Sequence, residues 1–257
     1  MGFLRRSMLV VASSSSGSKI NIDDYVTFEA LEDGFTVKLS RNDTEYCVDG
    51  DGNWKTLASG TTSQSINNGQ TISFRGNCTI NSSTGSTGGI GTFTLSKKCN
   101  VRGNVMALLY GDSGKDNVSL SGKNYAFCRL FESGTTIQSV STNFLPATTV
   151  SQYCYYRMFY GCTSLTTAPT LPAVTLSTSQ RYCYQYMYYN CSKLTYIKAM
   201  FTTDPGSRNS SNQAYYTYNW VSGVASSGTF VKNSSATWNR TGVWAVPSGW
   251  TIQTASS

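Results

Sequence analysis

Apolar positions in the second half of the chain recur at a nearly fixed spacing. Residues 153–176 read YCYYRMFYGCTSLTTAPTLPAVTL, a similar run returns 29 residues later over 182–199, and a weaker copy covers 125–150. The copies align on Phe131, Phe159 and Tyr188. The apolar positions then coincide as Leu130, Met158 and Met187, as Ile137, Leu165 and Leu194, and as Val140, Ala168 and Ile197. A repeat of this length predicts stacked units that bury one another's apolar faces.

The preceding part of the chain alternates apolar and polar residues over short runs. These runs occupy 25–30, 35–39, 44–48, 53–57, 71–75 and 91–95, and clusters of Asp, Asn and Gly separate them. Short strands with turns at this spacing predict a small Ig-like β-sandwich. Trp54 is the expected central plug of that sandwich, because its ring removes a large apolar area from water.

Further patterns lead into and out of the repeats. Residues 101–110 (VRGNVMALLY) predict a strand that enters the repeats, and residues 228–232 predict a strand after them. Trp238, Trp244 and Trp250 are expected to form a capping layer, since an open end of a repeat stack must be covered. The predicted parts are 1–19 as an N-terminal docking peptide and linker, 20–98 as the β-sandwich, 99–205 as the repeats and 206–257 as a C-terminal cap.

Composition supports packed β structure and a binding role. The chain is rich in Ser, Thr, Asn and Gly, yet its 17 Tyr, 11 Phe and 5 Trp argue against disorder. Of its charged residues, 7 basic side chains and one acid, Asp204, lie in 134–257. This mostly positive charge favours anionic partners such as acidic polysaccharide. Lys and Arg are too sparse for a groove that follows nucleic-acid phosphates, so no nucleic-acid partner is expected.

The residues do not predict catalysis. The chain has no histidine, which removes the commonest general base and the usual activator of a Ser or Cys nucleophile. Its eight cysteines form no C-x-x-C pair. Because Cys154 and Cys183, like Cys162 and Cys191, take equivalent places in successive copies, a repeated small buried slot is favoured over a disulfide framework. We expect no enzyme activity, no cofactor and no metal.

One acidic loop resembles part of a calcium-binding loop. Asp49 and Asp51 alternate with glycine, as in the first half of an EF-hand. That loop needs Gly at its sixth position and Glu at its twelfth, where this chain has Trp54 and Gly60. A hairpin turn, which also favours Asp and Asn beside Gly, is the predicted structure.

The N-terminus combines basic and apolar residues. Arg5 and Arg6 precede a five-residue apolar run that is too short for an export signal or a membrane span. We therefore expect no membrane insertion. A frayed tail is one interpretation, but a docking peptide that orders on a partner is favoured. Its predicted contact residues are Phe3, Leu4, Arg5, Arg6, Met8, Leu9 and Val10.

The central repeat resembles a known family. Its run FYGCTSLTTAPTLPAVTL is similar to the BspA-like leucine-rich repeat of Bacteroidetes surface and phage proteins, with matches at Met158, Phe159, Gly161, Cys162 and Leu165. Pro169, Leu171, Pro172 and Ala173 match as well. The first copy departs from this pattern at Gly134 and the third at Tyr188 and Asn190. The order of motifs over about 20–252 also resembles structural proteins of crAss-like phages that infect gut Bacteroides.

The resemblance implies a fold and a function class. The expected fold is mostly β, with an N-terminal small Ig-like β-sandwich followed by a short leucine-rich-repeat-like β-solenoid and a C-terminal cap. The implied function is that of a phage virion protein, assembled in the host cytoplasm as a capsid-attached head fibre or decoration protein. Its N-terminus would bind the capsid or another virion protein. A bacterial surface adhesin and a tail-associated receptor-binding protein are the alternatives.

Tyrosines mark the candidate recognition surface. Fourteen of the 17 lie at or after Tyr125, and a tyrosine offers both an apolar face and a hydroxyl to a sugar or protein. About half of them are expected to pack inside the stack. The others should bind host-surface glycan or protein, and fibre proteins of this kind are expected to form homodimers or homotrimers. The candidate surface comprises Tyr156, Arg157, Tyr160, Arg181, Tyr186, Tyr189 and Lys193.

Overall fold

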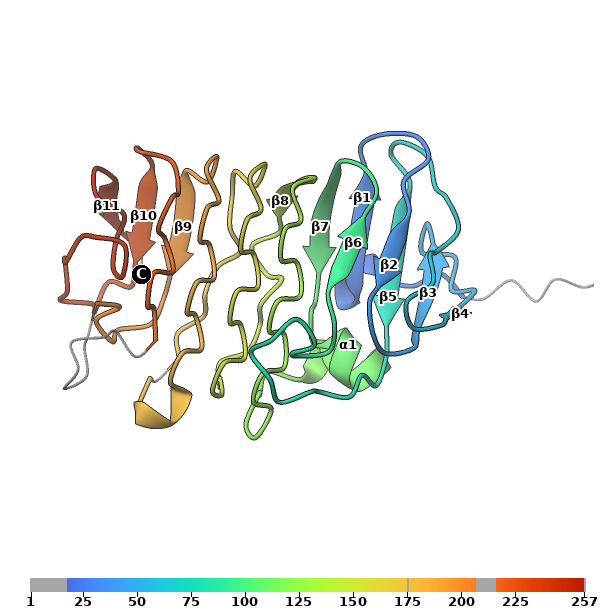
Figure 1. Ribbon diagram of the computed structural model, residues 1–257, viewed down its shortest axis with the longest axis horizontal. Coiled ribbons are helices and arrows are strands. Elements are labelled where there is room, and N and C mark those ends of the chain that lie inside the picture. The colour runs from blue at the N-terminus through green and yellow to red at the C-terminus, as the bar shows by residue number, and fades with distance from the viewer. Residues whose placement is uncertain (1–17, 175, 207–215, 257) are drawn as a thin grey trace, which may run out of the picture.

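The computed structural model describes residues 18–174, 176–206 and 216–256. Strands far outnumber helices in this part of the chain, which confirms the predicted mostly-β character (Figure 1). The strands are β1 (Val26–Ala30), β2 (Val37–Leu39), β3 (Thr44–Val48), β4 (Lys55–Leu57), β5 (Thr71–Arg75), β6 (Phe93–Leu95), β7 (Cys99–Gly103), β8 (Ile137–Val140), β9 (Tyr196–Ala199), β10 (Thr229–Lys232) and β11 (Thr251–Thr254). The helical elements are α1 (Ala107–Tyr110) and the 3-10 turns η1 (Ile22–Asp24), η2 (Gly111–Asp116) and η3 (Thr178–Gln180).

The N-terminal strands are antiparallel and surround an aromatic core. One sheet has the order β4-β3-β5-β1-β7-β8, and β2 pairs separately with β6. In the middle of the sheet, Phe28 of β1 lies opposite Ile72 of β5 and Val101 of β7. Its fully buried ring contacts the rings of Phe74 and Phe93 edge-on. Because β1 pairs with β7, this sheet continues past residue 98 into the repeat region.

From β7 onward the pairing is parallel. β7 pairs with β8, and β9, β10 and β11 pair in that order. Thr167 joins the two groups through single parallel bridges to Ser139 and Tyr196. In Figure 1 these strands lie side by side along the long axis of the molecule. The parallel pairing therefore extends through β10 and β11 into the segment predicted as a C-terminal cap.

Opposite the parallel strands, the chain forms a ribbon of consecutive turns with a period of four residues. We call residues 125–133, 153–161, 182–190 and 216–223 the turn segments. In the second, Tyr153, Arg157 and Gly161 all have positive φ. The Tyr156 N–H donates to the Tyr153 carbonyl within the segment, whereas the Tyr155 N–H donates to a carbonyl of the next segment. This alternation recurs along each segment, so the backbone donors are used without a regular strand.

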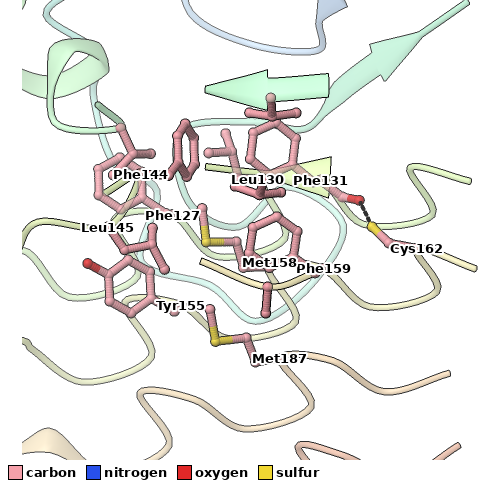
Figure 2. Packing of buried hydrophobic residues seen from close by; sticks show 14 of the residues in the cluster. Phe127, Leu130, Phe131, Phe144, Leu145, Tyr155, Met158, Phe159, Cys162 and Met187 are labelled. Atoms are coloured by element: carbon pink, nitrogen blue, oxygen red, sulfur yellow. Dashed lines mark hydrogen bonds between the residues drawn. The ribbon is translucent and has the colours of Figure 1, made fainter. Parts of the chain in front are cut away.

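Side chains between the two faces stack in columns. The buried rings of Phe131, Phe159 and Tyr188 follow one another at 5.4 and 5.8 Å, nearly parallel. Figure 2 shows the first two. Leu165 and Leu194 are fully buried, as the repeat alignment predicts. The aligned apolar positions are all buried: Leu130, Met158, Met187, Ile137, Leu165, Leu194, Val140, Ala168 and Ile197.

The cysteines occupy small buried slots, as predicted. All eight are buried free thiols. The Cys162 thiol donates to the carbonyl of Phe131 at 3.1 Å (Figure 2), and the Cys191 thiol donates to the carbonyl of Phe159 at 3.0 Å. Each thiol thus bonds to the backbone of the preceding unit, which explains why these cysteines recur with the repeat.

Two predictions about the N-terminal half are wrong. Trp54 is only half-buried, at the rim of the sheet, where its ring contacts Tyr25 and lies under the guanidinium of Arg75 at 4.0 Å. Residues 101–110 do not form one strand, because β7 ends at Gly103 with φ +89°. The Asn104 side chain then accepts a hydrogen bond from the Met106 N–H at 2.9 Å, and helix α1 follows.

The C-terminal segment covers the last units with aromatic rings. Trp238 and Trp250 are buried, whereas Trp244 is half-buried and stacks on Tyr218 at 5.4 Å. Trp220, in the fourth turn segment, is fully buried, and its indole N–H donates to the Ala245 carbonyl at 2.8 Å.

We expect Tyr188→Phe to raise the free energy of unfolding by about 1 kcal/mol. The Tyr188 hydroxyl is buried and has no hydrogen-bond partner, and the preceding units place Phe159 and Phe131 in the same column. Urea unfolding of the two proteins measures the difference. Tyr189→Phe is the matched control and should leave stability unchanged, because the Tyr189 hydroxyl is not a buried, unpartnered group. A loss of stability in Tyr188→Phe would contradict this prediction.

Candidate binding face

The outward side chains of the turn segments form one face of the molecule. In each four-residue step, two neighbouring side chains point into the core and the other two remain accessible. Tyr156, Arg157 and Tyr160 are half-buried on the second segment, and Tyr186 and Tyr189 are half-buried on the third. The structure therefore brings these five predicted residues together on adjacent segments.

Stacked tyrosines dominate this face. Tyr160 and Tyr189 stack with ring centroids 4.9 Å apart and 4° between the ring planes. Tyr125, Tyr153 and Tyr182 form a second and longer column, with centroids 4.8 and 5.0 Å apart. The sequence analysis did not include this second column among the candidate residues. The signal was available, because a tyrosine opens each of the three repeats at the same aligned position.

The hydroxyls of the longer column are open to a ligand. Burial, followed by the neighbouring Tyr125 and Tyr182, raises the pKa of Tyr153 to about 12. Burial also raises the pKa of Tyr125. No described residue hydrogen-bonds to the three hydroxyls. None of these hydroxyls is a buried group that lacks a partner. They can therefore donate and accept hydrogen bonds at the surface.

Arg157 is held inside an ion-pair network. Its Nε donates to a Glu132 carboxylate oxygen at 2.8 Å, and Arg129 contacts the other oxygen of Glu132 at 2.5 Å. The Arg157 guanidinium also lies 3.7 Å from the ring centroid of Tyr160. Burial opposes the charge of Arg157, but the hydrogen bond and charge of Glu132 raise its pKa. A carboxylate of a neighbouring unit, which Arg157 shares with Arg129, thus occupies its guanidinium, and this reduces what Arg157 can offer to an anionic ligand.

The two other predicted cations lie at opposite ends of the third segment. Arg181 is exposed immediately before the segment, and its carbonyl accepts a hydrogen bond from the Tyr153 N–H at 3.2 Å. Lys193 is exposed in the turn after the segment. Neither side chain has an ion-pair partner among the described residues. These are the cations of this face that remain available to a ligand.

Two other polar regions have many of their groups already in hydrogen bonds or ion pairs. A groove of about 520 Å³ is lined by residues of η1, β1, β7 and β8 and of the loop after β8. Several of these bond to one another: Arg102 with Asp23, and Asn100 with both Glu29 and Ser139. The Asp49 and Asp51 carboxylates accept backbone N–H groups of their own loop and of β5, as expected for a turn.

The described residues contain neither a cluster of metal-ligating side chains nor a membrane-spanning helix. They contain no group of three metal-ligating side chains of the His, Cys, Asp or Glu type. No helix within 18–174, 176–206 or 216–256 has the length and apolar character to cross a membrane. The predicted docking residues, Phe3, Leu4, Arg5, Arg6, Met8, Leu9 and Val10, lie outside the described part of the chain.

Comparison with known proteins gives no assignment. No family model matches the chain, no curated protein matches it, and no solved structure matches it.

Proposed function

We propose that the protein is a non-catalytic virion component of a Bacteroides-type phage that binds a host-surface glycan through its turn segments. The observation that carries the recognition role is the stacked tyrosine face, with free hydroxyls on Tyr153 and its neighbours and an unpaired Arg181. Tyrosine and arginine are the residues that recognition surfaces favour. The assignment to a phage particle rests on the resemblance in sequence, and attachment through residues 1–12 rests on their basic and apolar residues.

In this proposal the fold is a short leucine-rich-repeat-like β-solenoid behind a small Ig-like β-sandwich. The parallel pairing of β7 with β8 and of β9, β10 and β11 supports the solenoid, as does the column of Phe131, Phe159 and Tyr188. The antiparallel sheet around β1 and the separate β2–β6 pair support the sandwich. A solenoid suits a fibre or decoration protein, because it presents a long rigid face. We expect a homodimer or homotrimer on the particle.

Competition for phage adsorption tests the proposed function. Purified full-length chain, added to host cells before the phage, should reduce phage adsorption. A variant that lacks residues 1–12 should compete equally well, yet be missing from purified particles when it replaces the full-length chain during infection. Immunoblotting of the particles measures incorporation. Unchanged adsorption in the presence of the chain would contradict recognition, and incorporation of the shortened chain would contradict attachment through the N-terminus.

A further inference from the structure

We propose that a strip along one end of the turn segments binds an extended acidic polysaccharide edge-on, through hydrogen bonds rather than by sugar–ring stacking. We call it the tyrosine strip, and it consists of Tyr125, Tyr153, Tyr182, Asn124, Gln152 and Arg181. The inference rests on the proposed function and defines the ligand class and the contacting atoms. Two of its features, the blocked ring faces and a second polar column, are independent of the resemblance to any family.

The ring faces inside the strip are not available to a sugar. Tyr153 has Tyr125 on one side at 4.8 Å, with 10° between the planes, and Tyr182 on the other at 5.0 Å, with 22°. These separations are those of rings in direct contact, so no pyranose can enter between them. A ligand that approaches from solvent therefore meets the ring edges and the hydroxyls.

The hydroxyls form a regular row. The three tyrosines occupy equivalent positions, each with φ between 55° and 63°, and their rings are nearly parallel. Their hydroxyls should therefore follow one another at about the ring spacing. Since no described residue hydrogen-bonds to them, each can donate one bond and accept another. A row of this kind matches a linear polymer with a polar group on every repeating unit.

A second polar column runs beside the first. Tyr125 N–H donates to the Gln152 carbonyl at 3.0 Å, and Tyr153 N–H donates to the Arg181 carbonyl at 3.2 Å. These bonds align Asn124, Gln152 and Arg181 in successive units, each one residue before a strip tyrosine. Asn124 and Arg181 are exposed and Gln152 is half-exposed, and none of the three side chains has a partner among the described residues. Amide and guanidinium groups thus flank the phenol row.

The charge of the strip selects an acidic ligand. The guanidinium of Arg181 can bind a carboxylate with two parallel hydrogen bonds. The one acid in 134–257, Asp204, pairs with Arg240 and so does not neutralise Arg181. A nucleic acid would need many more cations along its path. The strip offers a single guanidinium among neutral groups, which suits a polysaccharide with spaced carboxylates.

The backbone of the turn segments excludes a partner that binds by adding a strand. Strand addition needs free N–H and C=O groups along an edge. In the turn segments the N–H groups donate either within the segment or to the next one, as those of Tyr155 and Tyr156 do. Recognition must therefore use side chains.

Binding of immobilised polysaccharides to the full-length chain tests the inference. The probes are polygalacturonate, alginate and hyaluronate, together with methyl-esterified polygalacturonate, which keeps the polymer but removes its charge. Tyr153→Phe keeps the stacked ring and removes one hydroxyl, and it should weaken binding of the acidic polymer about 2- to 10-fold. Arg181→Gln should weaken binding of the acidic polymer but not of the ester. Tyr196→Phe, in β9 on the opposite side of the molecule, should bind like the parent.

The outcomes separate this inference from the proposed function. If the parent binds an acidic polymer but Tyr153→Phe and Arg181→Gln bind it equally well, edge-on binding by the strip is wrong and glycan recognition stands. Loss of binding in Tyr153→Ala with full binding in Tyr153→Phe would point to ring contact and would also overturn the inference. If the parent binds none of the polymers, the acidic-polysaccharide ligand is wrong. Glycan recognition, as one part of the proposed function, is then contradicted too, whereas attachment to the particle is not. Circular dichroism of each variant checks that it is folded.

Discussion

Gly103→Ala is expected to destabilise the folded chain by about 3–5 kcal/mol. Gly103 ends β7 with φ +89°, and a Cβ at this position would lie 1.8 Å from the Tyr25 carbonyl oxygen. That carbonyl accepts a hydrogen bond from the Asn104 N–H at 3.0 Å. The residue after Tyr25, Val26 of β1, pairs with Gly103 of β7. The methyl group can be accommodated only if β1 and β7 move apart, which disrupts the sheet where it enters the repeats. Urea unfolding measures the loss.

Gly122→Ala measures the part of this loss of stability that comes from backbone strain alone. Gly122 also has positive φ, at +70°, but a Cβ there would meet no atom within 4 Å. Only the strain of a left-handed backbone should remain, about 1–2 kcal/mol. Equal losses in the two variants would show that the close approach to Tyr25 contributes nothing.

Raising the pH from 8 to 10 is expected to lower the free energy of unfolding by about 5–6 kcal/mol through four of the buried thiols, and the four others, whose pKa burial also raises, add to this fall. Burial raises the pKa of the Cys78, Cys99, Cys128 and Cys154 thiols from 9.0 to about 12. Between pH 9 and 12 these thiols ionise in the unfolded chain and stay protonated in the folded one. The unfolded state then binds fewer protons, so stability falls as pH rises, by about 1.4 kcal/mol per thiol at pH 10. Below about pH 8 the thiols contribute little pH dependence, because they are then protonated in both states.

Urea unfolding under reducing conditions at pH 8, 9 and 10 checks this prediction. In Cys154→Ala the fall between pH 8 and 10 should be smaller by the share of one thiol, whatever the effect of the substitution on stability at pH 8. A free energy of unfolding that stays constant from pH 8 to 10 would mean that the thiols are accessible to solvent in the folded chain.

The core of the repeats could be predicted because it depends on apolar periodicity alone. Aligning the copies on Phe159 placed Leu165 and Leu194 in one column, and both are fully buried. The cysteine slots followed from the same alignment. Trp54 was misplaced because size alone does not decide burial. The Arg75 guanidinium lies over the Trp54 ring, and Phe28 occupies the core instead.

The four-residue period of the turn segments could not be predicted from local propensity. Tyr153, Arg157, Tyr182 and Tyr186 all have positive φ, which turns normally assign to Gly or Asn. Here the hydrogen bonds between neighbouring segments fix that conformation, and they exist only once the units have stacked. The expectation that about half of the tyrosines pack inside the stack gave no information on this period.

The candidate site was predicted in part for the same reason. The tyrosine-rich runs do lie together on one face, but which cations are free depends on partners from other units. Arg157 was expected to bind a ligand, whereas it pairs with Glu132, 25 residues earlier in the chain. Asn124, Gln152 and Arg181 share no residue type, so only the backbone register shows that they form a column.

The alternating backbone bonds of the turn segments make the molecule extensible. A duplicated copy of 153–181 would present the same donors and acceptors on both sides, and would lengthen the chain by about the 5.0 Å that separates Tyr153 from Tyr182. It would also add one phenol to the row. Duplication of one copy would thus lengthen the surface in whole steps while leaving its chemistry intact.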